Sequence, residues 1–416
     1  MRYQVVAVGL VAVAVVMTSP PARLIATTAL NLHIAGSPAD IGSVTCLSGA
    51  PDGSMWLAIE IRRDLSVYAG SRSVLYKVPS ATDRFEKVLD ISGHGPIRRL
   101  WFFGPGRALA WLGGDFERPT PSSIMRTVDG GVRWSSSPTP NPKMDITGDL
   151  PVVIGVSFTT PAEGWALVST GVAAHSHGSA LYHTLDGGDH WTEITRVEPG
   201  QLHANGLSTW LKTGIEFRDA QHGWMGTDSE YMVSRMPSLF MSKDAGAKWE
   251  QEELPPPPPA GAPAPWTGKV MAPRFFGTQT GIVIALLSPE IDEKTPFVYQ
   301  TADGGRTWGD PRPFPISAKI FPDDFPQLDI LSPTIWAAAS NQTLWLTSNA
   351  GRTWSEHSVP LPPTYKVDRI ALAGSTQVWV VGSEGSPGVK PIAGYIILET
   401  EDAGLHWTRV VFPQVP

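Results

Sequence analysis

Five aspartates and one asparagine recur along the chain at a near-regular spacing, and carboxylates repeated in this way could act as general acids and bases or as metal ligands. Successive members are 46 to 59 residues apart, and they are Asp129, Asp186, Asp244, Asp303, Asn349 and Asp402. Each holds the third position of the pattern Ser/Thr-x-Asp-x-Gly-x-x-Trp, which ends at Trp134, Trp191, Trp249, Trp308, Trp354 and Trp407. A chance match should occur at roughly one position in tens of thousands. The pattern is therefore a true repeat.

The residue types of the repeat favour a structural role for its carboxylates over a catalytic one. An aspartate at a turn accepts hydrogen bonds from backbone N–H groups two or three residues ahead, and glycine supplies a positive φ. The tryptophan covers the hairpin with a large apolar area. Asn349 can accept the same bonds without charge. Because the six carboxylate positions fall in separate units, no two can share a substrate, and we predict no catalytic residue among them.

The segments around each repeat predict a four-stranded unit. A short apolar run precedes each copy, and an aromatic landmark lies further upstream at Trp111, Trp165, Trp224, Trp336 and Trp379, with Ile282 or Ile284 in the fourth copy. The chain also contains 41 glycines and 39 prolines, which favours an all-β protein. A period of 40–60 residues of strand and turn is typical of propeller blades.

A degenerate unit between Ser43 and Leu89 adds a seventh repeat that lacks the glycine and the tryptophan. We therefore predict a seven-bladed β-propeller of four-stranded antiparallel blades, with the repeated turn between the third and fourth strands. The blades are expected at roughly 40–92, 96–137, 150–197, 212–254, 269–314, 326–359 and 367–413, within a propeller that spans 36–416.

Charge, cysteine content and the N-terminus limit the class of protein. The net charge is −7 and no Lys/Arg block of five residues occurs, which argues against nucleic acid as a partner. Cys46 is the only cysteine, so we expect a buried inert thiol and no intrachain disulfide. An apolar run over 5–17 follows Met1 and Arg2, so residues 1–29 are predicted to be a signal peptide or an uncleaved N-terminal anchor. The expected location is extracytoplasmic: periplasmic, secreted, or membrane-anchored outside the cytoplasm. The expected state is a monomer.

Candidate binding residues fall on predicted inner strands and in long connections. Five arginines on inner strands could converge on the central channel as a site for an anion or an acidic peptide: Arg98, Arg99, Arg218, Arg274 and Arg369. Trp210 and Trp266 lie in long segments between blades, where they could stack on sugars, contact a protein or pack beneath the loop. His175 and His177 are a weak metal pair, so no metal and no cofactor is predicted. The long segments share the face opposite the repeated turns, where we expect any binding site.

The repeat resembles the Asp-box, or bacterial neuraminidase repeat, of sialidase-like β-propellers. Its layout is most similar to seven-bladed proteins of the photosystem II stability/assembly-factor type. The box is shared by glycosidases, sorting receptors and assembly factors, so the resemblance implies a fold more than an activity. Sialidases of this kind carry an Arg-Ile-Pro motif and six blades, and this chain has no Arg-Ile-Pro. We expect a non-enzymatic scaffold that binds a protein or a cell-surface glycan through the face that carries the long segments. The alternative is a glycan-cleaving hydrolase.

Overall fold

The computed structural model describes residues 41–62, 71–79, 84–114, 120–141, 152–173, 176–201, 203–229, 238–257, 266–288, 295–315, 327–385, 390–391 and 394–411. The chain divides into two compact units, Met1–Ile34 and Ala35–Pro416. The predicted signal segment lies outside the described residues. Within the described ranges, no helix is long and apolar enough to cross a membrane.

The described part of Ala35–Pro416 is built from antiparallel strands and contains no α-helix. The first sheet contains β1 (Ile41–Gly49), β2 (Met55–Arg62), β3 (Arg72–Val78) and β4 (Glu86–Ser92). The second contains β5 (Ile97–Phe102), β6 (Ala108–Leu112), β7 (Ser123–Thr127) and β8 (Ser135–Pro138). The third contains β9 (Val153–Phe158), β10 (Gly164–Ala173), β11 (Ser176–Thr184) and β12 (Thr192–Val197). A short hairpin of β13 (His203–Ala204) and β14 (Leu207–Ser208) follows.

The next two strand groups are joined into one nine-stranded sheet by a single residue pair, Asp228 with Lys269. They contain β15 (Leu211–Phe217), β16 (Gly223–Asp228), β17 (Leu239–Ser242) and β18 (Glu250–Glu252); and β19 (Thr267–Val270), β20 (Arg274–Phe276), β21 (Thr280–Ser288), β22 (Thr295–Thr301) and β23 (Arg312–Pro313). The remaining strands are β24 (Gln327–Ile330), β25 (Trp336–Ser340), β26 (Thr343–Thr347) and β27 (Ser355–Ser358); and β28 (Tyr365–Leu372), β29 (Val378–Glu384), β30 (Lys390–Pro391), β31 (Tyr395–Thr400) and β32 (Thr408–Val410).

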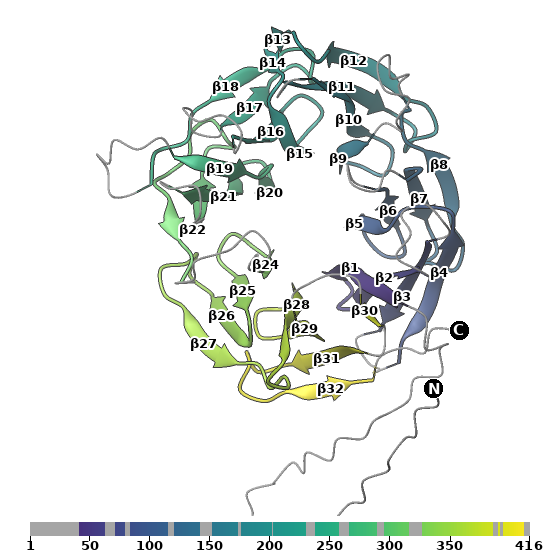
Figure 1. Cartoon of the computed structure of the whole chain (residues 1–416), viewed down its shortest axis with the longest axis vertical. Helices are drawn as coiled ribbons and strands as arrows, with labels where there is room; N and C mark the ends of the chain where they lie inside the picture. The colour runs from purple at the N-terminus through teal and green to yellow at the C-terminus, as the bar shows by residue number, and fades with distance from the viewer. Residues whose placement is uncertain are drawn as a thin grey trace, which may run out of the picture. The chain divides into compact units, whose positions relative to one another are not determined.

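The strand groups follow one another around a common axis, with β1, β5, β9, β15, β20, β24 and β28 nearest to it (Figure 1). Among these inner strands, β15 contacts β9, and β28 contacts both β24 and β1. The ring closes where β30 pairs with β1 and the Tyr395 hydroxyl donates to the Gly42 carbonyl at 3.2 Å. This arrangement is a β-propeller, as the repeat predicts.

Burial along the strands explains the apolar runs in the sequence. All residues of β6, β10 from Gly164 to Thr170, and all of β16 are buried, because these strands have neighbours on both edges and both faces. Outer strands such as β4 are largely exposed. The upstream tryptophans lie on the second strand of their group, and Trp165, Trp224 and Trp336 are fully buried. In β21, Ile282 pairs with Gln300, at the position that Trp224 holds opposite Met241 in β16.

Each of the six repeats forms the same hydrogen-bonded turn. In the first copy, the Thr127 hydroxyl donates to the Asp129 carboxylate at 2.9 Å and accepts the Gly131 N–H at 2.9 Å. Asp129 accepts the N–H of Arg133, four residues ahead. In the fourth copy, Asp303 accepts the N–H of Arg306, three residues ahead as predicted, and also that of Thr307, four ahead. The Ser/Thr hydroxyl takes the nearer amides, so the carboxylate is left to close the far end of the turn. Asn349 makes the same bond to Thr353 at 3.0 Å.

β-Bulges interrupt several inner strands at a similar level. The register shifts between Val44 and Cys46 in β1, between Ile97 and Arg99 in β5, between Lys212 and Gly214 in β15, and between Val367 and Arg369 in β28. A bulge bends its strand and re-aims the following side chain. Cys46, Arg99 and Arg369 therefore hold equivalent positions on three inner strands.

Candidate functional site

Arg99 is the inner-strand arginine with the strongest partner. Its Nη1 and Nη2 atoms donate to the Glu216 carboxylate at 2.7 and 3.2 Å, and its guanidinium lies 4.9 Å from the Trp101 ring centroid. The pair joins β5 to β15, which have β9 between them along the ring (Figure 1). The two-atom contact fixes the geometry of both side chains.

The other charged groups near the axis are also paired across or along strands. Arg274 lies 3.6 Å from Asp329, and Asp329 accepts the N–H of Leu372 at 2.7 Å, which ties β24 to β28. Burial raises the pKa of Asp329, against the opposing charge of Arg274. Arg369 lies 3.4 Å from the Asp368 carboxylate on the same strand.

Cys46 is half-buried and not buried as predicted, and charged side chains act on its thiol. Burial raises the pKa of its thiol to about 12, and Arg369, Asp329 and Arg99 are the charged groups that act on it. The thiol is therefore protonated at neutral pH and is a poor nucleophile. These three charged groups belong to three different strand groups. Carboxylates lie beside Arg99, Arg274 and Arg369, so charges of both signs occur near the axis.

Two of the predicted arginines make other contacts. Arg98 donates its Nε to the Gly113 carbonyl at 2.9 Å within its own sheet. Arg218 follows the end of β15, and its guanidinium lies 5.6 Å from the Trp224 ring centroid. The prediction placed Arg218 on the inner strand, but the strand ends at Phe217, so Arg218 belongs to the turn that follows.

The predicted aromatic and histidine candidates are mostly packed. Trp266 is 8% exposed and meets Phe297 edge-on at 6.0 Å, so it is covered rather than available for stacking. Trp210 is half-buried against Phe240. His177 lies on β11, paired with Val172, and His175 lies outside the described residues. β10 extends to Ala173 and β11 begins at Ser176, so His177 lies on a strand and not in a long loop. No group of three metal-ligating side chains occurs in the described ranges.

Sequence reasoning missed the acidic partners Glu216, Asp329 and Asp368. Each lies on an inner strand and borders a buried apolar residue, as in Ile215-Glu-Phe217. A charged residue within an otherwise apolar inner strand was the signal that could have identified them.

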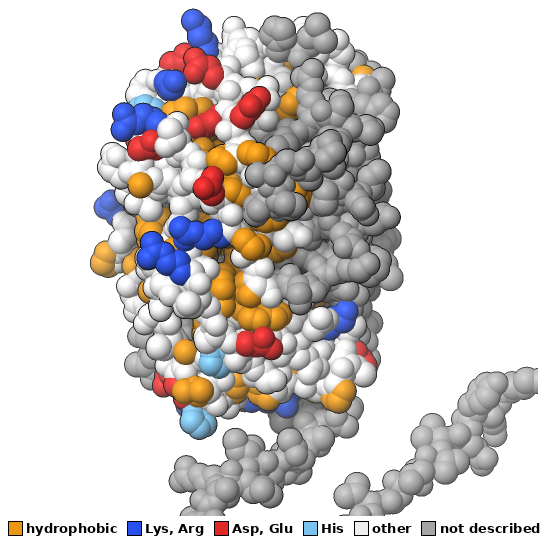
Figure 2. Space-filling view, turned by 90° about the vertical axis from the view of Figure 1, so that its left-hand side faces the viewer, with side chains coloured by type: hydrophobic (Ala, Val, Ile, Leu, Met, Phe, Trp, Pro, Cys, Tyr) orange, Lys and Arg blue, Asp and Glu red, His pale blue; other side chains and the backbone are white. Residues whose placement is uncertain are grey.

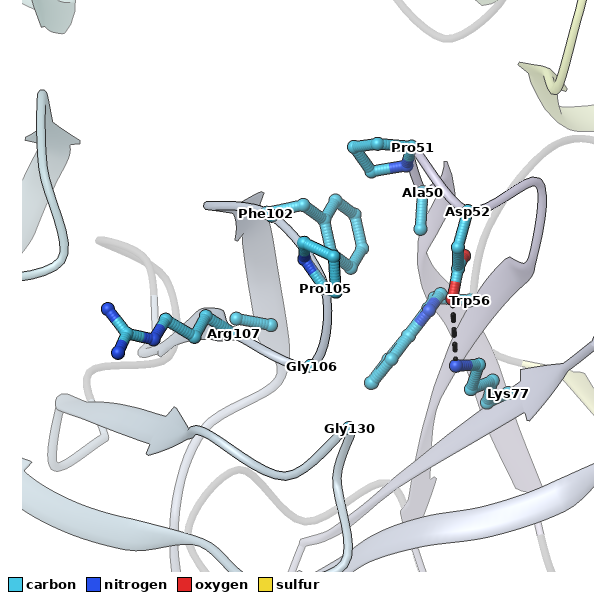
Figure 3. Close-up of a pocket in the computed structure, with 12 residues that line it drawn as sticks. Ala50, Pro51, Asp52, Trp56, Lys77, Phe102, Pro105, Gly106, Arg107 and Gly130 are labelled. Atoms are coloured by element: carbon cyan, nitrogen blue, oxygen red, sulfur yellow. Dashed lines mark hydrogen bonds and ion pairs between the residues drawn. The ribbon is translucent and has the colours of Figure 1, made fainter.

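Two pockets lie on the side of the repeated turns. The first has a volume of about 130 Å³ and lies between the β1–β2 turn and the β5–β6 turn; its walls include Trp56, Phe102, Pro105 and Gly130 (Figure 3). The second, of about 610 Å³, adjoins the first repeated turn and includes Arg107 and Arg126. Most of the long connections on the opposite face fall outside the described residues. On the side drawn in Figure 2, acidic and basic side chains are interspersed with apolar ones.

No protein-family model matches the chain, and no curated protein sequence matches it. Its fold is similar to that of YCF48 bound to D1 peptide, with a TM-score of 0.46 and 18% identity over 75% of this chain and 81% of that one. It is also similar to YCF48 from Cyanidioschyzon merolae (TM-score 0.49, 12% identity, 88% and 97% covered). A third similar structure is an α-L-arabinanase from Penicillium chrysogenum (TM-score 0.43, 13% identity, 73% and 90% covered). At these identities the likeness is one of fold alone.

Proposed function

We propose that this chain is a seven-bladed propeller of the Asp-box type that acts outside the cytoplasm as a non-enzymatic scaffold for a protein partner. The blades are the β1–β4, β5–β8, β9–β12, β15–β18, β19–β23, β24–β27 and β28–β32 groups. The repeated turn hydrogen bonds support the Asp-box assignment, and the apolar segment over 5–17 supports export.

The observation that carries the non-enzymatic proposal is the pairing of carboxylates near the axis. Glu216, Asp329 and Asp368 each lie beside an arginine of this chain. A retaining glycosidase needs two carboxyl groups about 5 Å apart that can reach the sugar. Carboxylates already held by arginines and backbone amides are poorly placed for that work.

One observation favours the alternative, a glycoside hydrolase. Burial raises the pKa of Asp329, and a raised carboxyl pKa is a property of general acids. If Asp329 were such an acid, Asp329→Asn would abolish turnover. Under the scaffold proposal, the wild-type protein has no glycan turnover, and the same substitution changes only its stability.

The test is a pull-down from the native envelope fraction with the full chain, run beside a glycan array and a reducing-end assay. Reproducible enrichment of one protein, without glycan turnover, supports the scaffold. Specific glycan retention with turnover that Asp329→Asn abolishes would overturn it. Fractionation with alkaline carbonate separates a cleaved signal from an anchor, and light scattering tests the monomer. Recovery of the chain in the cytoplasm would contradict the proposed location.

A further inference from the structure

Neighbouring strand groups are linked three times by an arginine that reaches the next repeated turn. Arg126 donates to the Asp186 carbonyl at 2.8 Å, and Arg312 donates to the Ala350 carbonyl at 2.7 Å. Arg218 donates in the same way to the Gly304 carbonyl. In all three cases the acceptor is the third or fourth residue of a repeat. The three arginines come from different elements, and each places its guanidinium against the backbone of a repeated turn.

The Arg218 interface shows what surrounds such a guanidinium. Its central carbon lies 5.6 Å from the Trp224 ring centroid and 5.8 Å from that of Phe275. Asp219 accepts from its Nε and Nη2 at 3.0 and 2.8 Å. Two aromatic rings, one carboxylate and one carbonyl are therefore sufficient to hold the cation.

The first interface repeats the two rings but not the arginine. Trp56 lies 5.5 Å from Phe102, between ring centroids, as Trp224 lies 4.5 Å from Phe275. Both tryptophans are the second residue of their strand, β2 and β16.

The turn before Trp56 shows which residue replaces the arginine. The Ala50 N–H donates to the Ser54 carbonyl at 2.8 Å, and the Arg218 N–H donates to the His222 carbonyl at 3.0 Å, so the two turns are closed by the same bond. Ala50 therefore stands where Arg218 stands in the later turn. The short alanine side chain leaves the guanidinium position unfilled by the turn itself.

The space left is the first pocket. A Cβ added at Gly130 would meet nothing within 4 Å, whereas one added at Gly304, the same repeat position, would lie 2.3 Å from Nη1 of Arg218. In Figure 3, Phe102 and Pro105 face Trp56 across the pocket, Ala50 lies above it and Gly130 lies below. The Asp52 carboxylate borders the opening and binds the Lys77 ammonium at 3.1 Å. That ammonium also lines the pocket and lies 5.6 Å from the Trp56 ring centroid, so an incoming guanidinium would share the ring and the carboxylate with Lys77.

The geometry points to a binding site for one guanidinium group in this pocket, supplied by an arginine side chain of a protein partner. The cation would lie beside the Trp56 and Phe102 rings, as Arg218 lies beside Trp224 and Phe275, toward the backbone of Gly130 and with Asp52 at the entrance. The volume of about 130 Å³ is below the 300–1,000 Å³ of pockets for larger ligands, so it suits one side chain. The net charge of −7 favours the approach of a basic partner. We call this guanidinium site the slot. The assignment of its arginine to a protein partner rests on the proposed scaffold function, whereas the slot itself does not.

The slot is tested with Nα-acetyl-arginine amide as the probe, using the indole N–H signal of Trp56 in the full chain, assigned with Trp56→Phe. We expect a saturable shift in the millimolar range. Citrulline and leucine amides should bind at least tenfold more weakly, because they lack the cation. Ala50→Arg should fill the slot from within and abolish the shift, whereas Ala50→Ser, the matched control, should retain it. Equal binding of leucine or citrulline, or an unchanged shift in Ala50→Arg, would overturn the site.

The reciprocal variant tests whether the two interfaces are equivalent. Arg218→Ala should lower the thermal midpoint, and the arginine amide should restore part of that loss while the citrulline amide does not. Absence of selective rescue contradicts the equivalence.

Partner use is tested separately by repeating the envelope pull-down with Ala50→Arg and Ala50→Ser. Loss of the enriched protein with Ala50→Arg alone supports an arginine of the partner in the slot. If both variants enrich the partner equally, no arginine of that partner occupies the slot. This result would leave the binding of the small probe and the scaffold proposal unaffected.

Discussion

The fourth position of the repeat is alanine in some copies and glycine in others, so it allows a test of backbone strain within one protein. Ala245, Ala350 and Ala403 adopt φ of 59°, 61° and 60°, in the left-handed region. The equivalent Gly130 and Gly304 have φ of 75° and 74°. Left-handed backbone costs a residue with a Cβ about 1–2 kcal/mol, while glycine adds roughly 0.4–1 kcal/mol of flexibility to the unfolded chain. We expect Ala245→Gly to stabilise the protein by about 0.5–1 kcal/mol.

The reverse change at Gly130 measures the same energetic cost of a positive φ. Because a Cβ there meets nothing within 4 Å, Gly130→Ala should destabilise the protein by about 0.5–1 kcal/mol through φ alone. Gly304→Ala should cost more, because its Cβ would lie 2.3 Å from Nη1 of Arg218 and 2.6 Å from the Thr278 carbonyl. Ala350→Gly should be near neutral, since the alanine is 8% exposed and loss of its buried methyl, worth about 0.8 kcal/mol, offsets the relief.

Urea unfolding followed by tryptophan fluorescence measures these changes as shifts of the midpoint at a constant m-value. The expected order of stability is Ala245→Gly, wild type, Gly130→Ala, then Gly304→Ala. If Ala245→Gly lowered the midpoint, or if Gly130→Ala left it unchanged, positive φ would not be the source of the strain. A changed m-value would instead show that the variant altered the unfolding reaction.

Three further predictions concern charged groups. Bonds from the backbone and side chain of His406 lower the pKa of Asp402 to about 2, so its stabilisation is present above pH 3.8 and is lost as the pH falls through 2. Asp402→Asn should therefore flatten the acid loss of stability in urea midpoints measured from pH 5 to 2, and an unchanged slope would contradict this. Burial raises the pKa of Glu252 to about 7, so the folded state favours its protonated form and loses stability as the pH rises from 4.5 through 7. Glu252→Gln should raise the unfolding free energy by up to about 3 kcal/mol at pH 8 and leave it unchanged at pH 4, and an equal effect at both would refute the titration. A double-mutant cycle of Arg99→Ala and Glu216→Ala should give a coupling of about 1 kcal/mol in unfolding free energy, weaker at high salt; additive effects would show that the pair contributes nothing.

The local parts of the fold could be predicted because their causes lie within a few residues. The turn of each repeat is closed by bonds between positions at most four apart, as between Asp129 and Arg133. The upstream tryptophans mark strands with neighbours on both edges, which is why Trp165 and Trp224 appear in the sequence among apolar runs. Period and residue type together were sufficient for the propeller.

The candidate site could be predicted only in part. Arg99 and Glu216 are 117 residues apart, and no local pattern shows that they meet. The bulge before Arg99 re-aims its side chain, and sequence alone does not locate bulges. Arg218 was misplaced because a strand boundary differs by one residue, which moves a side chain from the axis to a turn. The first pocket was missed because its defining feature is a small residue, Ala50, where another interface has an arginine.

The closure between β1 and the last strand group has a consequence for synthesis. The Tyr395 hydroxyl and the Gly42 carbonyl are separated by 353 positions, so this contact forms only after nearly the whole chain has been made. Until then, the face of β1 that will contact β28 has no partner, and joining ends so far apart carries a large entropic cost for the chain. If the chain is exported unfolded, it crosses the membrane before that step. The ring would then assemble as a late event at its destination, and a truncation before Tyr395 would leave an open, aggregation-prone arc in place of a shorter propeller.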